Sequence, residues 1–222
     1  MFDSDHSKED EILQTDVKQS TEQVMEARHS VRKYDSSEEI PRGKLNEILR
    51  LAATAPSSWN LQHWRFLIVT DPAQKERLLP IAYGQQQVVD AYATIVILGD
   101  LEADKSALRV YNDSLEKGYI NEQVRDTLVA QIEQAYQNNP QLARDEAIRN
   151  ASLAAMQLML AAKAKGYDTC PMGGFDREAL IEAFRIPSRY LPVMIITMGK
   201  ASVPAYPTSR FGLDELVIEN SF

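Results

Sequence analysis

The chain has 222 residues, of which 44% are hydrophobic and 25% charged, and this composition suits one globular domain with a sizeable core. The net charge of −8 argues against a nucleic-acid binder, because neutralising phosphates requires an excess of Lys and Arg. The single cysteine, Cys170, excludes an intrachain disulfide and is expected to be a small core residue, and with three histidines it forms no metal-ligand spacing, so no metal is expected.

The N-terminal segment, residues 1–20, is polar and charged and is expected to be a flexible tail or a weak helix. It has neither a basic start nor an apolar stretch, so it does not resemble a signal peptide. The longest apolar run, residues 151–162, is far shorter than the ~20 residues that cross a bilayer. We therefore expect a cytoplasmic protein with one domain over residues 21–222.

Two helices are predicted next, over residues 21–27 and about 43–54, from apolar residues at helical spacing. The basic segment RHSVRK lies between them. On a helix end, Arg28 and Arg32 share a face with the Ser30 hydroxyl between them, and this group suits a phosphate because Arg binds anions with a planar fork. Taken alone, the motif fits a solvated basic face that pairs with nearby acids better than it fits a binding site.

The loop after the second helix is uncharged and rich in hydrogen-bonding side chains. In the run from Pro56 to Gln62, the side chains of Ser57, Ser58, Asn60 and Gln62 supply neutral donors and acceptors of the kind that the ring edge and ribityl chain of a flavin require. Both tryptophans of the chain, at positions 59 and 64, flank this loop. The alternative is ordinary turn chemistry beside one buried core tryptophan.

Three nearly continuous apolar runs, residues 65–70, 92–99 and 193–199, predict central strands covered on both faces. Helical stretches separate them, which indicates an α+β or α/β domain in three layers. Between residues 101 and 144 a helical excursion is expected, with a polar helix over 121–137 that ends before Pro140.

The helix predicted over residues 151–162 is apolar nearly all round and should be buried nearly all round, with Gly166 suited to its C-cap. A helix shared with a partner subunit explains this pattern, and so does a central helix in a monomer. Further on, Gly173 and Gly174 permit positive φ and let backbone amides approach a planar ligand. The alternative there is a simple strand-to-helix turn, with Asp176 capping a helix that ends near Phe184.

Four sequence blocks, in this order, resemble the FMN-dependent nitroreductase family. They are Arg-His-Ser-x-Arg, Pro-Ser-Ser-x-Asn-x-Gln-x-Trp, Gly-Gly-Phe-Asp and a final Ser-Arg, and the resemblance covers about residues 21–215. Residues 151–176 are especially similar to a bacterial subgroup of NAD(P)H nitroreductases linked to quinone and aromatic-electrophile resistance. The resemblance implies an α+β fold of three α/β/α layers, with a central mixed sheet flanked by helices, and an intertwined homodimer with FMN at the subunit interface.

The resemblance also implies roles for individual residues. Arg28, Ser30 and Arg210 would hold the FMN phosphate, and Arg32 would lie near the pyrimidine edge of the ring, where positive charge raises the flavin potential. The whole implied cofactor-binding set is Arg28, His29, Ser30, Arg32, Pro56, Ser57, Ser58, Asn60, Gln62, Gln87, Pro171, Met172, Gly173, Gly174 and Arg210.

In this set, Ser57 and Ser58 would reach the flavin of the other subunit. Asn60 and Gln62 would serve the polar edge of the ring, and the amides of Gly173 and Gly174 would lie near the flavin N5.

The chain departs from the family at two cationic positions. Many relatives carry a Lys before the central strand, where this chain has glutamines at 85, 86 and 87, of which Gln87 is the chosen flavin contact. Some relatives also carry a Lys at the position of Thr208. Fewer cations should give a lower flavin potential or weaker FMN binding.

The implied activity is ping-pong electron transfer from NAD(P)H through FMN to nitroaromatic or quinone-type acceptors. No side chain need act as acid or base, which suits a sequence without a triad or a carboxylate pair. Enoate reduction, dehalogenation or oxygen-dependent chemistry on the same scaffold are alternatives, as are a flavin-binding sensor without turnover and a dimer without cofactor. The sequence does not distinguish NADH from NADPH.

Overall fold

The computed structural model describes residues 19–139 and 141–222, so the predicted tail lies almost wholly outside the described residues. Its centre is a four-stranded sheet in the order β1-β2-β4-β3. The strands are β1 (Trp64–Val69), β2 (Ala93–Asp100), β3 (Asp168–Met172) and β4 (Tyr190–Gly199). The three predicted strands are therefore confirmed, and β3 is a fourth strand at one edge of the sheet.

All pairings between these strands are antiparallel, so the expectation of a mixed sheet is wrong for them. The parallel pairing among the described residues is an isolated bridge between Ser30 and Thr169. The unbroken apolar character of β2 reflects cover on both faces rather than parallel neighbours: all eight of its residues are buried.

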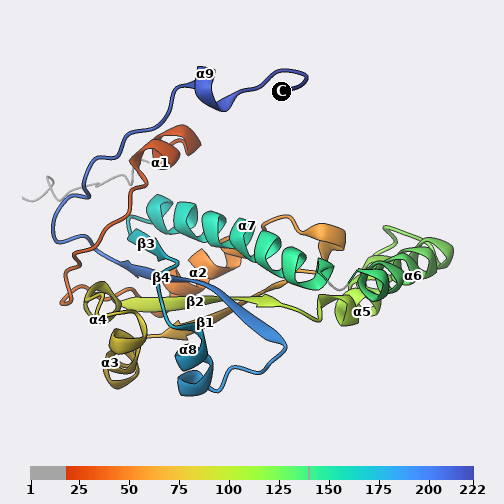
Figure 1. The fold of residues 1–222 in the computed structure, drawn as a ribbon, viewed down its shortest axis with the longest axis horizontal. Coiled ribbons are helices and arrows are strands. Elements are labelled where there is room, and N and C mark those ends of the chain that lie inside the picture. The colour runs from red at the N-terminus through yellow and green to blue at the C-terminus, as the bar shows by residue number, and fades with distance from the viewer. Residues whose placement is uncertain (1–18, 140) are drawn as a thin grey trace, which may run out of the picture.

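Helices cover both faces of the sheet and make three layers (Figure 1). One face packs against α2 (Arg42–Ala52) and α7 (Leu142–Ala164), and the other against α3 (Pro72–Ile81), α4 (Gln87–Asp90) and α8 (Arg177–Phe184). The side chains of β2 alternate accordingly, because Ile95 and Ile97 belong to the first core and Val96 to the second.

The long helix α7 begins nine residues before the predicted run and lies directly against the sheet. A Cβ on Gly99 of β2 would come within 2.7 Å of the carbonyl oxygen of Ala147, so only glycine permits this approach. The helix is not buried all round in the single chain. Its buried face includes Ala151 and Leu158, whereas Leu153 and Met156 are 44% and 41% exposed.

A helical excursion extends from one end of the sheet and contains η2 (Ala103–Ser106), α5 (Ala107–Glu116) and α6 (Glu122–Asn138). Its small core contains Ala103, Ala107 and Ile132 together with Leu61, which belongs to the loop before β1. The polar helix predicted over 121–137 is thus confirmed, and its packing joins the excursion to that loop.

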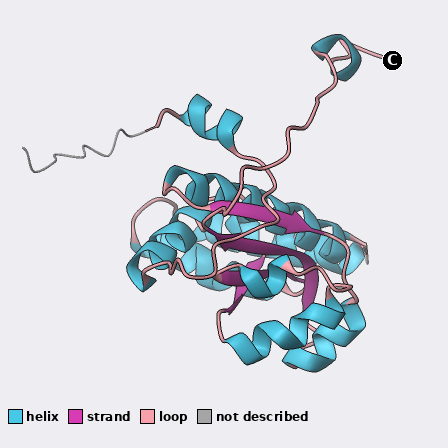
Figure 2. Cartoon of the chain, turned by 90° about the vertical axis from the view of Figure 1, so that its left-hand side faces the viewer, coloured by secondary structure: helices cyan, strands magenta, loops and turns pink. Residues whose placement is uncertain are grey.

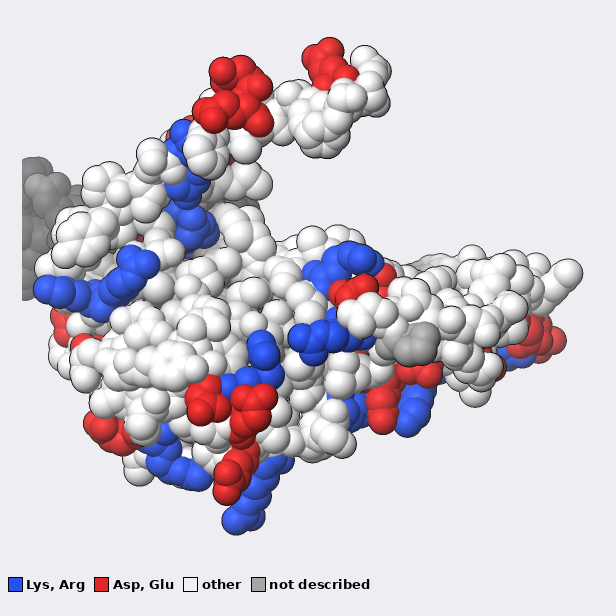
Figure 3. All heavy atoms as spheres, in the orientation of Figure 1, with Lys and Arg blue, Asp and Glu red and all other residues white. Residues whose placement is uncertain are grey.

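Both chain ends of the described part lie on the same side of the molecule (Figures 1 and 2). Helix α1 (Thr21–Ala27) begins with a capping box between Ser20 and Gln23. After β4 the chain forms an exposed arm, residues 202–222, that carries the short α9 (Leu213–Leu216). Figure 3 shows this arm standing clear of the body, with acidic side chains toward its end.

None of the helices in the described part of the chain combines the length and apolar character needed to span a lipid bilayer.

Candidate functional site

The basic segment after α1 is extended rather than helical. The helix ends at Ala27, and Arg28 has φ −74° and ψ 113°, so the expectation that Arg28 and Arg32 share a helix face is wrong. The segment instead lies beside β3, where Ser30 bridges Thr169 and the amide of Val31 donates to the Thr169 carbonyl at 3.0 Å. Alternate residues of an extended segment point to the same side. Arg28, Ser30 and Arg32 therefore still form one row.

The buried thiol of Cys170 reports that this row is close to β3. Burial raises the pKa of Cys170, against the positive charges of Arg32 and Arg28 and a side-chain hydrogen bond with Ser30, all of which lower it. Neither Arg28 nor Arg32 forms an ion pair within residues 19–139 and 141–222, so the paired basic face is not seen there. The row offers two guanidiniums and a hydroxyl on one side of an extended chain.

The glycine turn follows β3 directly and lies open. Gly173 and Gly174 are exposed, and a Cβ built on Gly173 would meet no atom within 4 Å. The positive φ that the paired glycines permit is not adopted, because neither glycine has one. Asp176 then caps α8 by accepting from the amide of Ala179. The predicted cap and the predicted helix end at Phe184 are confirmed.

Two glutamines hold this turn, Gln85 from the loop before α4 and Gln87 from the first position of α4. The side-chain amide of Gln85 donates to the carbonyl of Gly174 at 2.9 Å. Gln87 is buried, and its amide donates to the sulfur of Met172 at 3.0 Å and to Gln85 at 3.3 Å. Gln87 thus lies next to the predicted residues Pro171–Gly174, with its amide nitrogen already engaged.

The polar loop before β1 has an unusual backbone. Trp59, Asn60 and Gln62 have φ values of 51°, 55° and 51°, in the left-handed region that non-glycine residues seldom adopt. Within the loop, the amide of Gln62 donates to the hydroxyl oxygen of Ser57 at 3.0 Å. From α5, the Tyr111 hydroxyl donates to the carbonyl of Trp59 at 3.1 Å. These contacts hold one conformation of the loop.

Two side chains of α7 bind Ser58 of this loop, and neither belongs to the site residues predicted from the sequence. The Ser58 amide donates to Oδ1 of Asn150 at 2.9 Å, and the Ser58 hydroxyl donates to the carboxylate of Glu146. Burial raises the pKa of Glu146, but hydrogen bonds from Ser58 and Asn150 and the charge of Arg149 outweigh it and leave the pKa below its ordinary value. The available signal was a Glu and an Asn four residues apart at the start of an apolar helix.

A buried histidine lies beneath the same loop. His63 has no exposed surface, its Nε2 is 2.9 Å from the hydroxyl of Tyr136, and its Nδ1 has no partner among the described residues. Burial lowers the pKa of His63 and raises that of Tyr136. The Tyr136 ring also packs against Trp59, with ring centroids 6.5 Å apart. The excursion therefore supports the polar loop through both tyrosines.

The predicted residues form two groups at opposite edges of the sheet. The row at 28–32, the turn at 171–174 and Gln87 lie by β3, whereas the loop 56–62 precedes β1 at the far edge (Figure 1). Arg210 joins neither group, because it lies in the exposed arm and donates to Thr208 and to the Ser209 carbonyl. A single chain does not bring the whole predicted set together.

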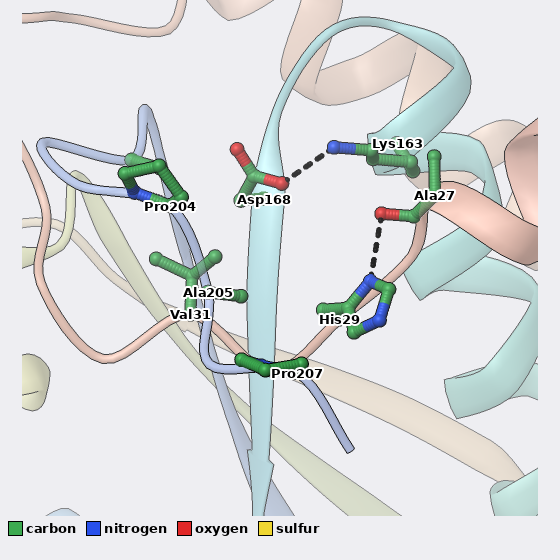
Figure 4. A pocket seen from close by; sticks show the side chains of 9 residues that line it. Ala27, His29, Val31, Lys163, Asp168, Pro204, Ala205 and Pro207 are labelled. Carbon is green, nitrogen blue, oxygen red and sulfur yellow. Dashed lines mark hydrogen bonds and ion pairs between the residues drawn. The ribbon is translucent and has the colours of Figure 1, made fainter. Parts of the chain in front are cut away.

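A cavity of about 390 Å³ lies beside the same extended segment, on the side of the arm (Figure 4), and is lined by Ala27, His29 and Val31 rather than by the row itself. His29 lines this cavity together with Lys163 and Asp168, whose Nζ and Oδ1 atoms form an ion pair at 2.8 Å. Pro204 and Pro207 of the arm complete the lining. His29 is its one residue from the predicted set, so this cavity borders the predicted site without being assembled from it. In the described part of the chain, no three His, Cys, Asp or Glu residues are grouped so that they could hold a metal ion.

Comparisons with known proteins extend over most of the chain. Residues 25–200 match the sequence model of the Nitroreductase family. “Putative NAD(P)H nitroreductase YodC” from Bacillus subtilis is 49% identical over 197 residues, which cover 89% of this chain and 97% of that protein. The “CLA biosynthesis enone reductase” of Lactiplantibacillus plantarum is 35% identical over 192 residues, which cover 85% and 88%.

One solved structure is similar to this chain in both sequence and fold. The crystal structure described as a “putative nitroreductase in complex with FMN” from Exiguobacterium sibiricum has 36% sequence identity and a TM-score of 0.85, and the match covers 90% of this chain and 97% of that one. The α+β fold expected from the resemblance is confirmed by this likeness.

Proposed function

The chain belongs to the nitroreductase family, and on that premise we propose that it is an FMN-dependent oxidoreductase that takes electrons from NAD(P)H and passes them to quinone-type or nitroaromatic acceptors. The observation that carries the proposal is the row of Arg28, Ser30 and Arg32 beside β3, next to the open turn at Gly173 and Gly174.

These residues suit the two chemical ends of FMN. A phosphate dianion takes charge-assisted hydrogen bonds, which Arg28 and Ser30 can donate from one side of the extended segment. A flat ring needs backbone without intervening side chains, and an added Cβ at Gly173 would meet only open space. The charge of Arg32 lies in the same row and would favour electron uptake by a nearby ring.

We propose further that the working molecule is a homodimer in which the loop 56–62 of one subunit completes the site of the other. Three observations support this. The two groups of site residues occupy opposite edges of one sheet. Helix α7 exposes Leu153 and Met156 on an apolar face. The arm carries Arg210 away from its own body, together with exposed Phe211 and Leu213.

When bound, FMN accepts a hydride from NAD(P)H and delivers two electrons to an acceptor, which is chemistry that no side chain of this chain supplies. The residues of the chain bind and orient. Arg28 and Ser30 would hold the phosphate end, together with Arg210 of the arm. The amides of Gly173 and Gly174, which donate no hydrogen bond among the described residues, are offered to the reacting edge of the ring.

The test begins with the purified chain. We expect a yellow protein with an FMN absorption spectrum, which NADH or NADPH bleaches rapidly in stopped flow and benzoquinone or a nitrofuran then restores. Protein that stays colourless after soaking in excess FMN would contradict the cofactor assignment. Protein that binds FMN but is reduced by neither nucleotide would contradict the oxidoreductase assignment and favour a sensor.

Enone reduction is a second candidate for the acceptor step, and it is favoured by the 35% identity to a relative named as an enone reductase. An enone and a quinone both accept a hydride at a carbon or oxygen conjugated to a carbonyl, so one open site could serve both. Steady-state rates with an α,β-unsaturated ketone and with benzoquinone, measured on the same preparation, show which of the two acceptors the protein reduces faster.

A further inference from the structure

Ser58 is bound through both of its donors by two side chains of one helix. Its amide donates to Asn150, and its hydroxyl donates to Glu146. The Asn150 amide closes the group by donating to the carbonyl of Glu146 at 2.7 Å and to its carboxylate at 2.8 Å. Glu146 and Asn150 are 5% and 1% exposed, and they lie four residues apart on the same face of α7.

This geometry fixes where the hydroxyl proton of Ser58 lies. An ionised carboxylate only accepts hydrogen bonds, and a serine hydroxyl has one proton and two lone pairs. Glu146 already accepts from Asn150 and from Arg149, so the proton between Ser58 and Glu146 belongs to Ser58. With its proton used, the Ser58 oxygen can present only lone pairs to a ligand.

The neighbouring serine has the opposite arrangement. The oxygen of Ser57 accepts from the amide of Gln62 at 3.0 Å, and its own proton is not engaged in the described structure. The loop therefore offers Ser57 as a hydrogen-bond donor and Ser58 as a hydrogen-bond acceptor. The hydrogen bonds of the two hydroxyls, to Glu146 and from Gln62, set these roles.

We propose that Glu146 and Asn150 are positioning residues that fix Ser58 as a hydrogen-bond acceptor toward a donor group of the bound FMN. The proposal rests on the proposed function, since it concerns the same cofactor. Flavins have few donors: the imide N–H of the ring and the hydroxyls of the ribityl chain. Ser58 would take one of these, while the Ser57 proton would pair with one of the many acceptors of the ring.

The experiment measures the FMN dissociation constant of the full-length apoprotein by flavin fluorescence. Glu146→Gln leaves too few acceptors for Ser58, Asn150 and Arg149, and we expect FMN binding to weaken about tenfold, as for the loss of one charge-assisted hydrogen bond. The matched control is Glu182→Gln, the same chemical change on the exposed surface of α8, which should stay within about twofold of the unchanged protein.

A double-mutant cycle separates positioning from general stability. Ser58→Ala should weaken FMN binding on its own, and in that background Glu146→Gln should have almost no further effect. A merely structural role of Glu146 would lower the melting temperature of the apoprotein and would persist without the Ser58 hydroxyl. If Glu146→Gln does not fold, Ser58→Ala alone decides: unchanged FMN affinity overturns the proposal.

Two further comparisons separate failure of the positioning role from failure of the proposed function. With 3-methyl-FMN, which lacks the imide N–H, a lost Glu146→Gln effect identifies the imide as the partner, and a retained effect identifies a ribityl hydroxyl. Failure of the unchanged protein to bind FMN defeats the proposed function. Normal FMN binding with Glu146→Gln and Ser58→Ala both equal to the Glu182→Gln control defeats only the positioning role.

Discussion

The side-chain amide of Gln85 donates a 2.9 Å hydrogen bond to the carbonyl of Gly174, which lies 89 residues further along the chain. This bond ties the loop before α4 to the open turn after β3. With Gln87 bound to Met172 beside it, the turn is held from one side by two neutral amides. The two glutamines orient the turn without adding charge to it.

Gln85→Ala should weaken FMN binding about threefold to tenfold, because a typical hydrogen bond contributes about 0.5–1.5 kcal/mol and its loss frees the glycine turn. Fluorescence titration of the apoprotein measures this. Gln86→Ala is the control, since that amide bonds only to Asp90 on the surface. Equal affinities of the two variants would show that the turn needs no support from Gln85.

Arg28→Ala should weaken FMN binding about tenfold to a hundredfold, since a hydrogen bond to a charged group contributes about 1.5–3 kcal/mol. The loss should shrink as salt is added, because salt already screens the attraction in the unchanged protein. Arg50→Ala, on the exposed side of α2, removes the same charge and should have little effect. A loss shared by both variants would point to net charge rather than to a phosphate contact.

Leu153→Glu should separate the proposed dimer into monomers and lower its FMN content, because it places a charge on the exposed apolar face of α7. Sedimentation equilibrium together with the visible spectrum measures both effects. Tyr83→Asn changes another exposed side chain, on the α3 side of the sheet, and should leave the dimer intact. A Leu153→Glu protein that remains dimeric and yellow would contradict an interface at this face.

Tyr136→Phe should lower the free energy of unfolding by about 1–3 kcal/mol, because it leaves the buried ring of His63 without any hydrogen bond. Urea unfolding followed by circular dichroism measures it. Tyr119→Phe, at a side chain that is 76% exposed, removes the same hydroxyl and should change the stability by less than about 0.5 kcal/mol. Equal stabilities would imply that the His63 contact contributes nothing.

His63 should also make the protein less stable in mild acid. Burial lowers its pKa in the folded state, so below the unfolded value of about 6.5 the unfolded chain binds the proton first. The free energy of unfolding should therefore fall as pH drops from 7 toward the folded pKa. Urea midpoints between pH 7.5 and 5 measure the slope, and His63→Gln should flatten it. An unchanged slope in that variant would assign the dependence to other groups.

Local signals in the sequence determined the parts of this fold that depend on near neighbours. The cap of α8 at Asp176, the end of α7 before Gly166 and the buried run of β2 follow from residues a few positions apart. The ordered motifs also sufficed to identify the family, because their residue types and spacing are read directly from the chain.

Only the tertiary structure decided the direction of the strands, the extended path of Arg28–Arg32 and the place of β3 at the edge of the sheet. Pro171 hides that strand in the sequence, and it is tolerated because β3 is an edge of the sheet. Glu146 was invisible for a similar reason: its partner Ser58 is 88 positions away. Contacts of this range depend on how helices and sheet pack, and no local pattern records which polar side chains the packing brings face to face.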